Sequence, residues 1–122
     1  MACIDDVARD FTAMLRLGQF EAAGEKFWAS EVMSAEPVAL SQDVPALSSG
    51  REAARRKIRA RFAEAEIDDL GIDGPFITGD QFALFLDMLI TDPATGKTQP
   101  FAEIAIFTVR DGRIIEERFF YD

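Results

Sequence analysis

The sequence predicts an α+β fold in which helices precede a curled antiparallel sheet. Apolar residues in the first half of the chain recur at three- and four-residue spacing, which is typical of helices. Residues 74–122 instead read as strands, and two turns among them, Gly79-Asp80 and Asp111-Gly112, have the residues that tight hairpins need. No linker, repeat or low-complexity segment divides the chain, so we expect residues 1–122 to form a single domain.

Two helices are expected near the N-terminus. Asp5 or Asp6 can cap the first helix, and Gly18 is expected to end it, because glycine readily takes the left-handed conformation that follows a helix. The second helix is shorter. The apolar positions are Val7, Phe11, Met14 and Leu15 in the first helix, and Phe20, Ala23, Phe27 and Trp28 in the second.

A strand over residues 32–36 and a third helix are expected next. Pro37 restricts Glu36 to an extended conformation. Residues 37–48 show no clear periodicity, and Ser49-Gly50-Arg51-Glu52 fits a capping box that opens the third helix. The apolar stripe of this helix consists of Ala54, Ile58, Phe62 and Ala65.

The remainder of the chain predicts four strands. Residues 67–77 form a glycine-interrupted strand, which suits a sheet edge or a bulge better than a sheet centre. The next three strands are expected at residues 81–91, 101–109 and 113–121. A long curled sheet preceded by helices can form a cone with a pocket inside it.

The composition of the chain limits its partners. With 122 residues it can bury about two-thirds of its unfolded surface without metals or disulfides. A net charge of −9 argues against nucleic acid and against anionic membranes. The one cysteine, Cys3, fits a reducing compartment, and no signal peptide or membrane-length apolar run is visible. We therefore expect a cytoplasmic protein with no nucleic-acid or membrane partner.

The absence of histidine limits the chemistry. It excludes Ser-His-Asp and Cys-His catalysis and leaves carboxylates as the acid–base groups near neutral pH. A transition-metal site is not expected, and no phosphate loop or dinucleotide motif is present. The remaining possibilities are chemistry without a cofactor or simple binding.

Four short segments carry a resemblance to a known family. They are Leu17-Gly18-Gln19-Phe20, residues 27–32 (Phe-Trp-Ala-Ser-Glu-Val), residues 79–83 (Gly-Asp-Gln-Phe-Ala) and residues 109–114 (Val-Arg-Asp-Gly-Arg-Ile). In this order they resemble the nuclear-transport-factor-2-like superfamily, and most closely its SnoaL-like branch. The resemblance implies a cone-shaped half-barrel, with three N-terminal helices packed in the concave face of a curved, mainly antiparallel sheet. It also implies a pocket between the two layers, and often a dimer.

Members of that superfamily include ketosteroid isomerase, polyketide cyclases, dehydratases, an epoxide hydrolase and binding domains without catalysis. The fold alone does not choose among these activities. Glu36 resembles the proton-shuttling Asp of the isomerase, whereas Phe11 and Ala105 stand where the isomerase has its two oxyanion donors. Losing one such donor typically costs about 2.7–4 kcal/mol, so we expect no steroid-isomerase chemistry. The cyclases commonly use a His on the last strand, and Glu117 lies near that place.

The turn at residues 110–112 decides whether two acids meet. Side chains alternate along a strand, so Glu103 shares one face with Phe101, Ala105 and Phe107, and Glu117 shares one with Ile115, Phe119 and Tyr121. A three-residue loop puts both sets on the same side, and a two-residue Asp-Gly turn separates them. We favour the three-residue loop because the resemblance places both sets in the pocket.

This arrangement predicts Glu36, Glu103 and Glu117 as catalytic carboxylates. Two carboxylates in an apolar pocket repel, so one should keep its proton near neutral pH. Alternatively, these glutamates pair with Arg110, Arg113 or Arg118, or with Tyr121, and only fix the sheet. The expected ligand-binding residues are Phe11, Met14, Trp28, Ala105, Phe107, Phe119 and Tyr121.

Several of these side chains also have a structural interpretation. Core packing is the commoner role for Trp28, and a surface or dimer role is as common for Tyr121. Three roles are open to Asp87: it serves a pocket, pairs with an arginine or marks a solvated face. The basic helix over residues 51–61 is expected to be a solvated helix face rather than an anion site.

The expected outer face of the sheet is apolar as well. It carries Ala102, Ile104, Ile106, Ile114 and Phe120, and a sheet that is apolar on both faces must cover both. We therefore expect a homodimer through the sheet. The function expected is binding of a small apolar or carbonyl-containing molecule, with cofactor-free proton transfer of the isomerase, cyclase, dehydratase or hydrolase type. The alternatives are a ligand-binding or structural domain without catalysis, and a module that presents its sheet to another protein.

Overall fold

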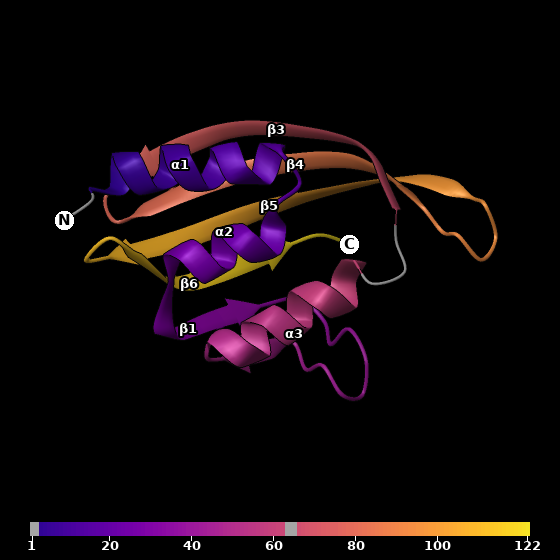
Figure 1. The fold of residues 1–122 in the computed structure, drawn as a ribbon, viewed down its shortest axis with the longest axis horizontal. Coiled ribbons are helices and arrows are strands. Elements are labelled where there is room, and N and C mark those ends of the chain that lie inside the picture. The colour runs from indigo at the N-terminus through magenta and orange to yellow at the C-terminus, as the bar shows by residue number, and fades with distance from the viewer. Residues whose placement is uncertain (1–2, 63–65) are drawn as a thin grey trace.

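Three helices cover one face of a curved six-stranded sheet in the computed structural model of the chain (Figure 1). The structure describes residues 3–62 and 66–122. The helices are α1 (Ile4–Arg16), α2 (Phe20–Phe27) and α3 (Arg51–Phe62). The strands are β1 (Trp28–Ala35), β2 (Leu47–Ser49), β3 (Glu66–Thr78), β4 (Gln81–Thr91), β5 (Thr98–Arg110) and β6 (Arg113–Phe120).

The sheet has the order β2-β1-β6-β5-β4-β3 and is mostly antiparallel. The one parallel pair described joins β1 to β6. The predicted fold class is confirmed: an α+β fold with three helices against a curved, open sheet. The prediction of an edge strand is also confirmed, since β3 lies at one edge and its pairing with β4 shifts register twice.

The ends of the elements differ from the predictions in four places. Helix α1 begins at Ile4, so Asp5 and Asp6 lie in its first turn instead of capping it, where acids favour the positive end of the helix. Gly50, with a φ of 92°, precedes α3, so the expected capping box at Ser49 is wrong. Trp28 begins β1 and does not belong to α2, and β2 was not expected. The predicted stripe residue Ala65 lies outside the described residues.

The hairpin between β5 and β6 corrects the predicted turn. Arg110 pairs with Arg113 across a two-residue turn, in which Asp111 and Gly112 both have positive φ, at 53° and 76°. This is the geometry of a type I′ turn, so the expected three-residue loop is wrong.

A β-bulge nevertheless places the two acids on one side. Val109 pairs with Ile114, but Thr108 pairs with Glu116, so Ile115 is an extra residue on β6. Beyond the bulge Phe107 faces Glu117, and the odd-numbered residues of both strands share the concave face, as expected. The bulge also turns Ile114 into the core, which corrects its predicted place on the outer face.

The hydrophobic core lies between the helices and the concave face of the sheet. Phe11 of α1 is at its centre, with its ring 4.9 Å from Phe107 and 6.0 Å from both Phe27 and Phe82. Within the described residues, no helix is long and apolar enough to cross a membrane.

Candidate functional site

Two buried carboxylates from adjacent strands line one small cavity inside the cone. Glu103 of β5 is 3% exposed and Glu117 of β6 is 2% exposed. We call this space the inner cavity; its volume is about 30 Å³, enough for one or two water molecules. About half of the residues that line it are aromatic: Phe11, Phe20, Trp28, Phe62, Phe107 and Phe119.

Glu117 is held by two hydrogen bonds from β1. Trp28 Nε1 donates to its Oε1 at 2.9 Å, and Ser34 Oγ donates to its Oε2 at 2.6 Å. The parallel pairing of β1 with β6 sets Ser34 opposite Glu117 and so brings these donors into reach. Gly24 makes room for the indole, because a Cβ at that position would lie 2.3 Å from the Trp28 ring. A buried carboxylate with both oxygens hydrogen-bonded is oriented but still faces the cavity.

Glu103 forms an ion pair with Arg61 of α3. Arg61 Nη2 donates to Glu103 Oε2, and the Arg61 side chain is 9% exposed. Its guanidinium lies 5.1 Å from the ring of Phe119 and 5.2 Å from that of Phe62, in the range of cation–π contacts. Burial raises the pKa of Glu103 above its ordinary value, and the charge and hydrogen bond of Arg61 offset this only in part. Glu103 therefore gains a proton more readily than an exposed glutamate.

Glu36 lies behind this pair and does not line the inner cavity. Lys57 Nζ donates to its Oε2 at 2.6 Å, and the hydroxyl of Tyr121 donates to its Oε1 at 2.7 Å. Arg61 Nε is 3.7 Å from Glu36 Oε1. Burial, and next the hydrogen bond to Glu36, raise the pKa of Tyr121. Lys57, Glu36, Arg61 and Glu103, in this order, thus form one buried chain of alternating charges.

The predicted ligand-binding residues fall into two groups, those that line the inner cavity and those that do not. Phe11, Trp28, Phe107 and Phe119 line the inner cavity. Met14 packs against the core, Ala105 is fully buried in the sheet, and Tyr121 points to Glu36.

Two of the three arginines suggested as partners of the glutamates, Arg113 and Arg118, are engaged elsewhere. Arg113 donates to the carbonyl of Lys26, and Arg118 to Glu116. Of the alternative set, only the bond from Tyr121 is found, to Glu36. Asp87 is exposed, so of its three suggested roles the structure shows the solvated face.

Lys57 and Arg61 were not predicted as residues of the site. Both were assigned to a solvated helix face, and the structure corrects this, because the Lys57 side chain is 0% exposed and that of Arg61 is nearly buried. Lys57 follows the buried Ala54 by three residues, and Arg61 follows Lys57 by four, so both lie on the same side of α3 as Ala54. That spacing was a visible signal. The predicted solvent exposure is correct for Arg56 and Arg59, which form ion pairs at the surface.

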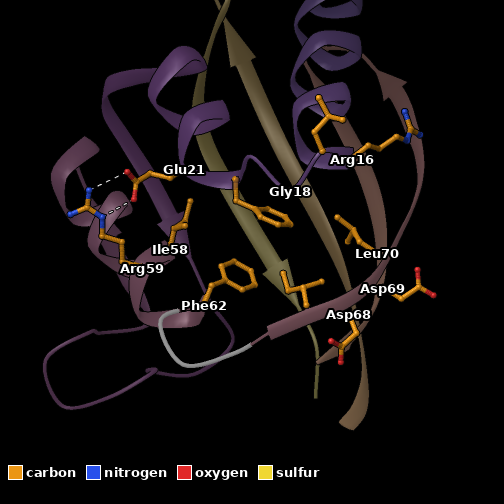
Figure 2. Close-up of a pocket in the computed structure, with 12 residues that line it drawn as sticks. Arg16, Gly18, Glu21, Ile58, Arg59, Phe62, Asp68, Asp69 and Leu70 are labelled. Atoms are coloured by element: carbon orange, nitrogen blue, oxygen red, sulfur yellow. Dashed lines mark hydrogen bonds and ion pairs between the residues drawn. The ribbon is translucent and has the colours of Figure 1, made fainter. Parts of the chain in front are cut away.

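A second, larger space lies outside the inner cavity. This outer groove, of about 960 Å³, runs between the ends of α1 and α3 and the start of β3 (Figure 2). Ile58 and Phe62 of α3 face Leu70 of β3 across it, whereas Arg16, Asp68 and Asp69 lie at its rim. Arg59 at the rim is tied to Glu21 by two hydrogen bonds, of 2.7 and 3.1 Å. The groove is therefore apolar inside and charged outside.

Comparisons with known proteins agree with this architecture. A family model described as the SnoaL-like domain matches residues 2–121. A Mesorhizobium loti protein assigned to the SnoaL-like polyketide cyclases is 36% identical, with a TM-score of 0.88 over 98% of this chain and 100% of that one. No curated protein matches the sequence.

Two more distant structures share the fold alone. An NTF2-like protein of unknown function from Burkholderia pseudomallei is 14% identical, with a TM-score of 0.81 over 100% of this chain and 92% of that one. TerC, crystallised with polyporic acid, is 14% identical, with a TM-score of 0.73 over 92% of this chain and 85% of that one.

Proposed function

The chain belongs to the SnoaL-like domain family, and from this premise we propose that it binds a small, mostly apolar carbonyl compound between its helices and its sheet. We propose that it then transfers a proton on that compound without a cofactor. The observation that carries the proposal is the meeting of two buried carboxylates and one buried guanidinium at a single aromatic cavity.

Glu103 and Arg61 have complementary roles in this proposal. The Glu103 carboxylate takes a proton from the carbon next to the carbonyl group, and the electron pair of that C–H bond forms an enolate. The negative charge on the enolate oxygen is stabilised by Arg61, the cation that lines the cavity. Glu103 returns the proton to a carbon of the enolate, so no redox partner is needed. The raised pKa of Glu103 makes it a stronger base than an exposed glutamate.

The other two carboxylates support this step. Glu117 faces the same cavity and is oriented by Trp28 and Ser34, so in the proposal it accepts a hydrogen bond from the ligand. Glu36, which the family resemblance marks as a proton shuttle, acts here by holding Lys57 and placing Arg61.

Binding of small carbonyl compounds tests the proposal. The melting temperature is measured with a panel of such compounds, enolic quinones of the polyporic acid type among them, for the wild-type protein and for Glu103→Gln. The matched control is Glu116→Gln, one residue from Glu117 on the opposite face of β6. We expect a shift in the wild type and in Glu116→Gln and a smaller one in Glu103→Gln. Equal shifts in all three proteins would remove Glu103 from the site.

A binding domain without catalysis is the second candidate. The small volume of the inner cavity and the engagement of all three carboxylates favour it. Exchange of the ligand's α-hydrogens with heavy water, followed by NMR, separates the two candidates. Proton transfer predicts faster exchange with the wild type than with Glu103→Gln. Binding without exchange would support the second candidate.

We also propose that a second copy of the chain covers the outer face of the sheet. Phe85, Ile104 and Phe120 are neighbours on three adjacent strands of that face and are 38%, 47% and 48% exposed. An apolar row of this kind is self-complementary about a twofold axis. Light scattering at micromolar concentration should give the mass of a dimer; the mass of a monomer would contradict the proposal.

A cytoplasmic location completes the proposal. Its support is the single, exposed cysteine, Cys3, because proteins of oxidising compartments commonly use paired cysteines. Fractionation of cells that express the chain should recover it with cytoplasmic markers. Recovery in the secreted fraction would contradict this part.

A further inference from the structure

The inner cavity is too small for the carbonyl compound of the proposed function. At about 30 Å³ it holds one or two waters, whereas sites for small organic molecules occupy about 300–1,000 Å³. A ligand that reaches Glu103 and Glu117 must therefore displace part of the wall. The wall can move outward at low cost only where empty space lies behind it, because close-packed interiors resist displacement.

One section of the wall meets this condition. Phe20, Ile58 and Phe62 line both the inner cavity and the outer groove, so they separate the buried acids from a space of about 960 Å³. The rings of Phe20 and Phe62 are stacked, with centroids 4.9 Å apart and planes 23° apart. Figure 2 shows Ile58 and Phe62 on the groove side of α3. Each of two other surface hollows shares a single residue with the inner cavity, Trp28 or Glu103, and both of these are buried strand residues.

We infer that the Phe20–Phe62 pair is an aromatic gate, through which a small neutral, apolar molecule passes from the outer groove to the inner cavity. The inference rests on the proposed function for the identity of that molecule, but not for the access route. The apolar interior of the groove suits such a molecule, and the charges at its rim are of both signs and favour neither anions nor cations.

The position of the two residues in the chain suits a moving part. Phe20 is the first residue of α2 and Phe62 is the last described residue of α3, and the outer turns of helices open more readily than their centres. Both side chains are only half-buried. Phe82 and Phe107 also stack, at 4.8 Å, but both are almost fully buried. The Phe82–Phe107 pair is therefore a buried reference for the Phe20–Phe62 pair.

The chain provides its own probe of the gate. Trp28 is the only tryptophan, is 1% exposed and lines the inner cavity. Quenching of its fluorescence by acrylamide, a small neutral molecule, reports access to the cavity without any ligand or activity. The rate constant of quenching is measured for the wild type, Phe20→Leu and Phe62→Leu. The matched control is Phe82→Leu, which removes one ring of the buried stack.

We expect quenching to rise several-fold in Phe20→Leu and in Phe62→Leu, and to stay near the wild-type value in Phe82→Leu. Far-UV circular dichroism establishes that each variant is folded, and either gate variant alone suffices. Unchanged quenching in a folded gate variant would overturn the inference, as would an equal rise in Phe82→Leu, which would reflect general loosening. If quenching rises in the gate variants but no carbonyl compound of the panel binds, the proposed function is overturned and the access route is still supported.

Discussion

Arg61 joins the two acidic parts of the site, since it contacts Glu103 and lies 3.7 Å from Glu36. Replacing it with methionine leaves these buried carboxylates without that cation. Breaking a buried ion pair on one side typically costs about 3–5 kcal/mol, so we expect a loss of this size in the free energy of unfolding of Arg61→Met. Urea denaturation at neutral pH measures it.

Two further variants control this measurement. Arg59→Met removes an exposed ion pair two residues away on α3 and is expected to cost at most about 1 kcal/mol. The double variant Arg61→Met/Glu103→Leu replaces both partners and should be more stable than Arg61→Met alone, because no charge of that pair remains buried. A loss from Arg61→Met no larger than that from Arg59→Met would contradict the buried network.

The raised pKa of Glu103 predicts a dependence of stability on pH. The unfolded carboxyl titrates near its ordinary value of 4.5, and the folded one at higher pH. Between the two values the folded protein binds more protons, so the contribution of Glu103 is fully present below pH 4.5 and is lost as the pH rises through its folded pKa. The stability of the wild type relative to Glu103→Gln should therefore fall across this window. Denaturation of both proteins over a pH series measures it, and a relative stability that rises would contradict the direction.

For single residues, the sequence predicts the buried acids of the site better than the basic residues that pair with them. The alternation of side chains, read together with the family resemblance, placed Glu103 and Glu117 in the interior, and both are buried. Lys57 and Arg61 were assigned to solvent because such residues are rarely buried unless paired. Their acidic partners come from β5 and from the residue after β1, and local periodicity does not show which distant carboxylates will be within reach.

Among the elements, α2 and β1 are coupled through Gly24. A Cβ at this position would lie 2.3–2.6 Å from three atoms of the Trp28 ring, so Gly24→Ala should displace the indole and weaken its bond to Glu117. Overpacking of this kind costs about 1–3 kcal/mol, which outweighs the gain of about 0.5–1 kcal/mol that alanine brings to a helix. Thermal unfolding and the emission wavelength of Trp28 measure both effects.

Repeating Gly24→Ala in the Trp28→Leu protein tests whether contact with the indole causes the loss of stability. In Trp28→Leu the clash is absent, and Gly24→Ala should then stabilise the protein through helix propensity. If Gly24→Ala destabilised both backgrounds equally, contact with the indole would not be the reason.

The hairpin between β5 and β6 shows how much of an element the sequence determines. Asp111-Gly112 has the residues of a two-residue turn, and that turn forms. Alone it would have turned Glu117 away from Glu103. The bulge at Ile115 returns Glu117 to the same face as Glu103. The local sequence does not predict this bulge, because its position depends on pairing with the neighbouring strands and on burial.

At the scale of the whole molecule, the prediction concerns the outer face of the sheet, which is the proposed dimer interface. Ile104 lies between Phe85 and Phe120 in the exposed row, so Ile104→Lys places a charge at the centre of the proposed dimer interface. We expect sedimentation to show a monomer for Ile104→Lys and a dimer for the wild type. The control is Leu17→Lys, at an exposed apolar residue after α1, which should remain dimeric.

The fold class was the most predictable property of the chain. Helical spacing, hairpin turns and the order of elements required only local patterns, and the family resemblance implied the three-helix, curved-sheet architecture that the structure shows. The volume of the interior was not predictable. It depends on how the aromatic side chains fill the cone, and here the stacked rings of Phe20 and Phe62 lie between the inner cavity and the outer groove.

The central claim, that small carbonyl compounds bind beside the buried acids, is tested most directly by NMR of the ¹³C-labelled carboxyl groups of glutamate. The titrant is the carbonyl compound with the largest effect on the melting temperature. We predict that the resonances of Glu103 and Glu117 shift with saturation while that of Glu116 stays in place. Shifts confined to surface glutamates, or none with any compound of the panel, would contradict the account.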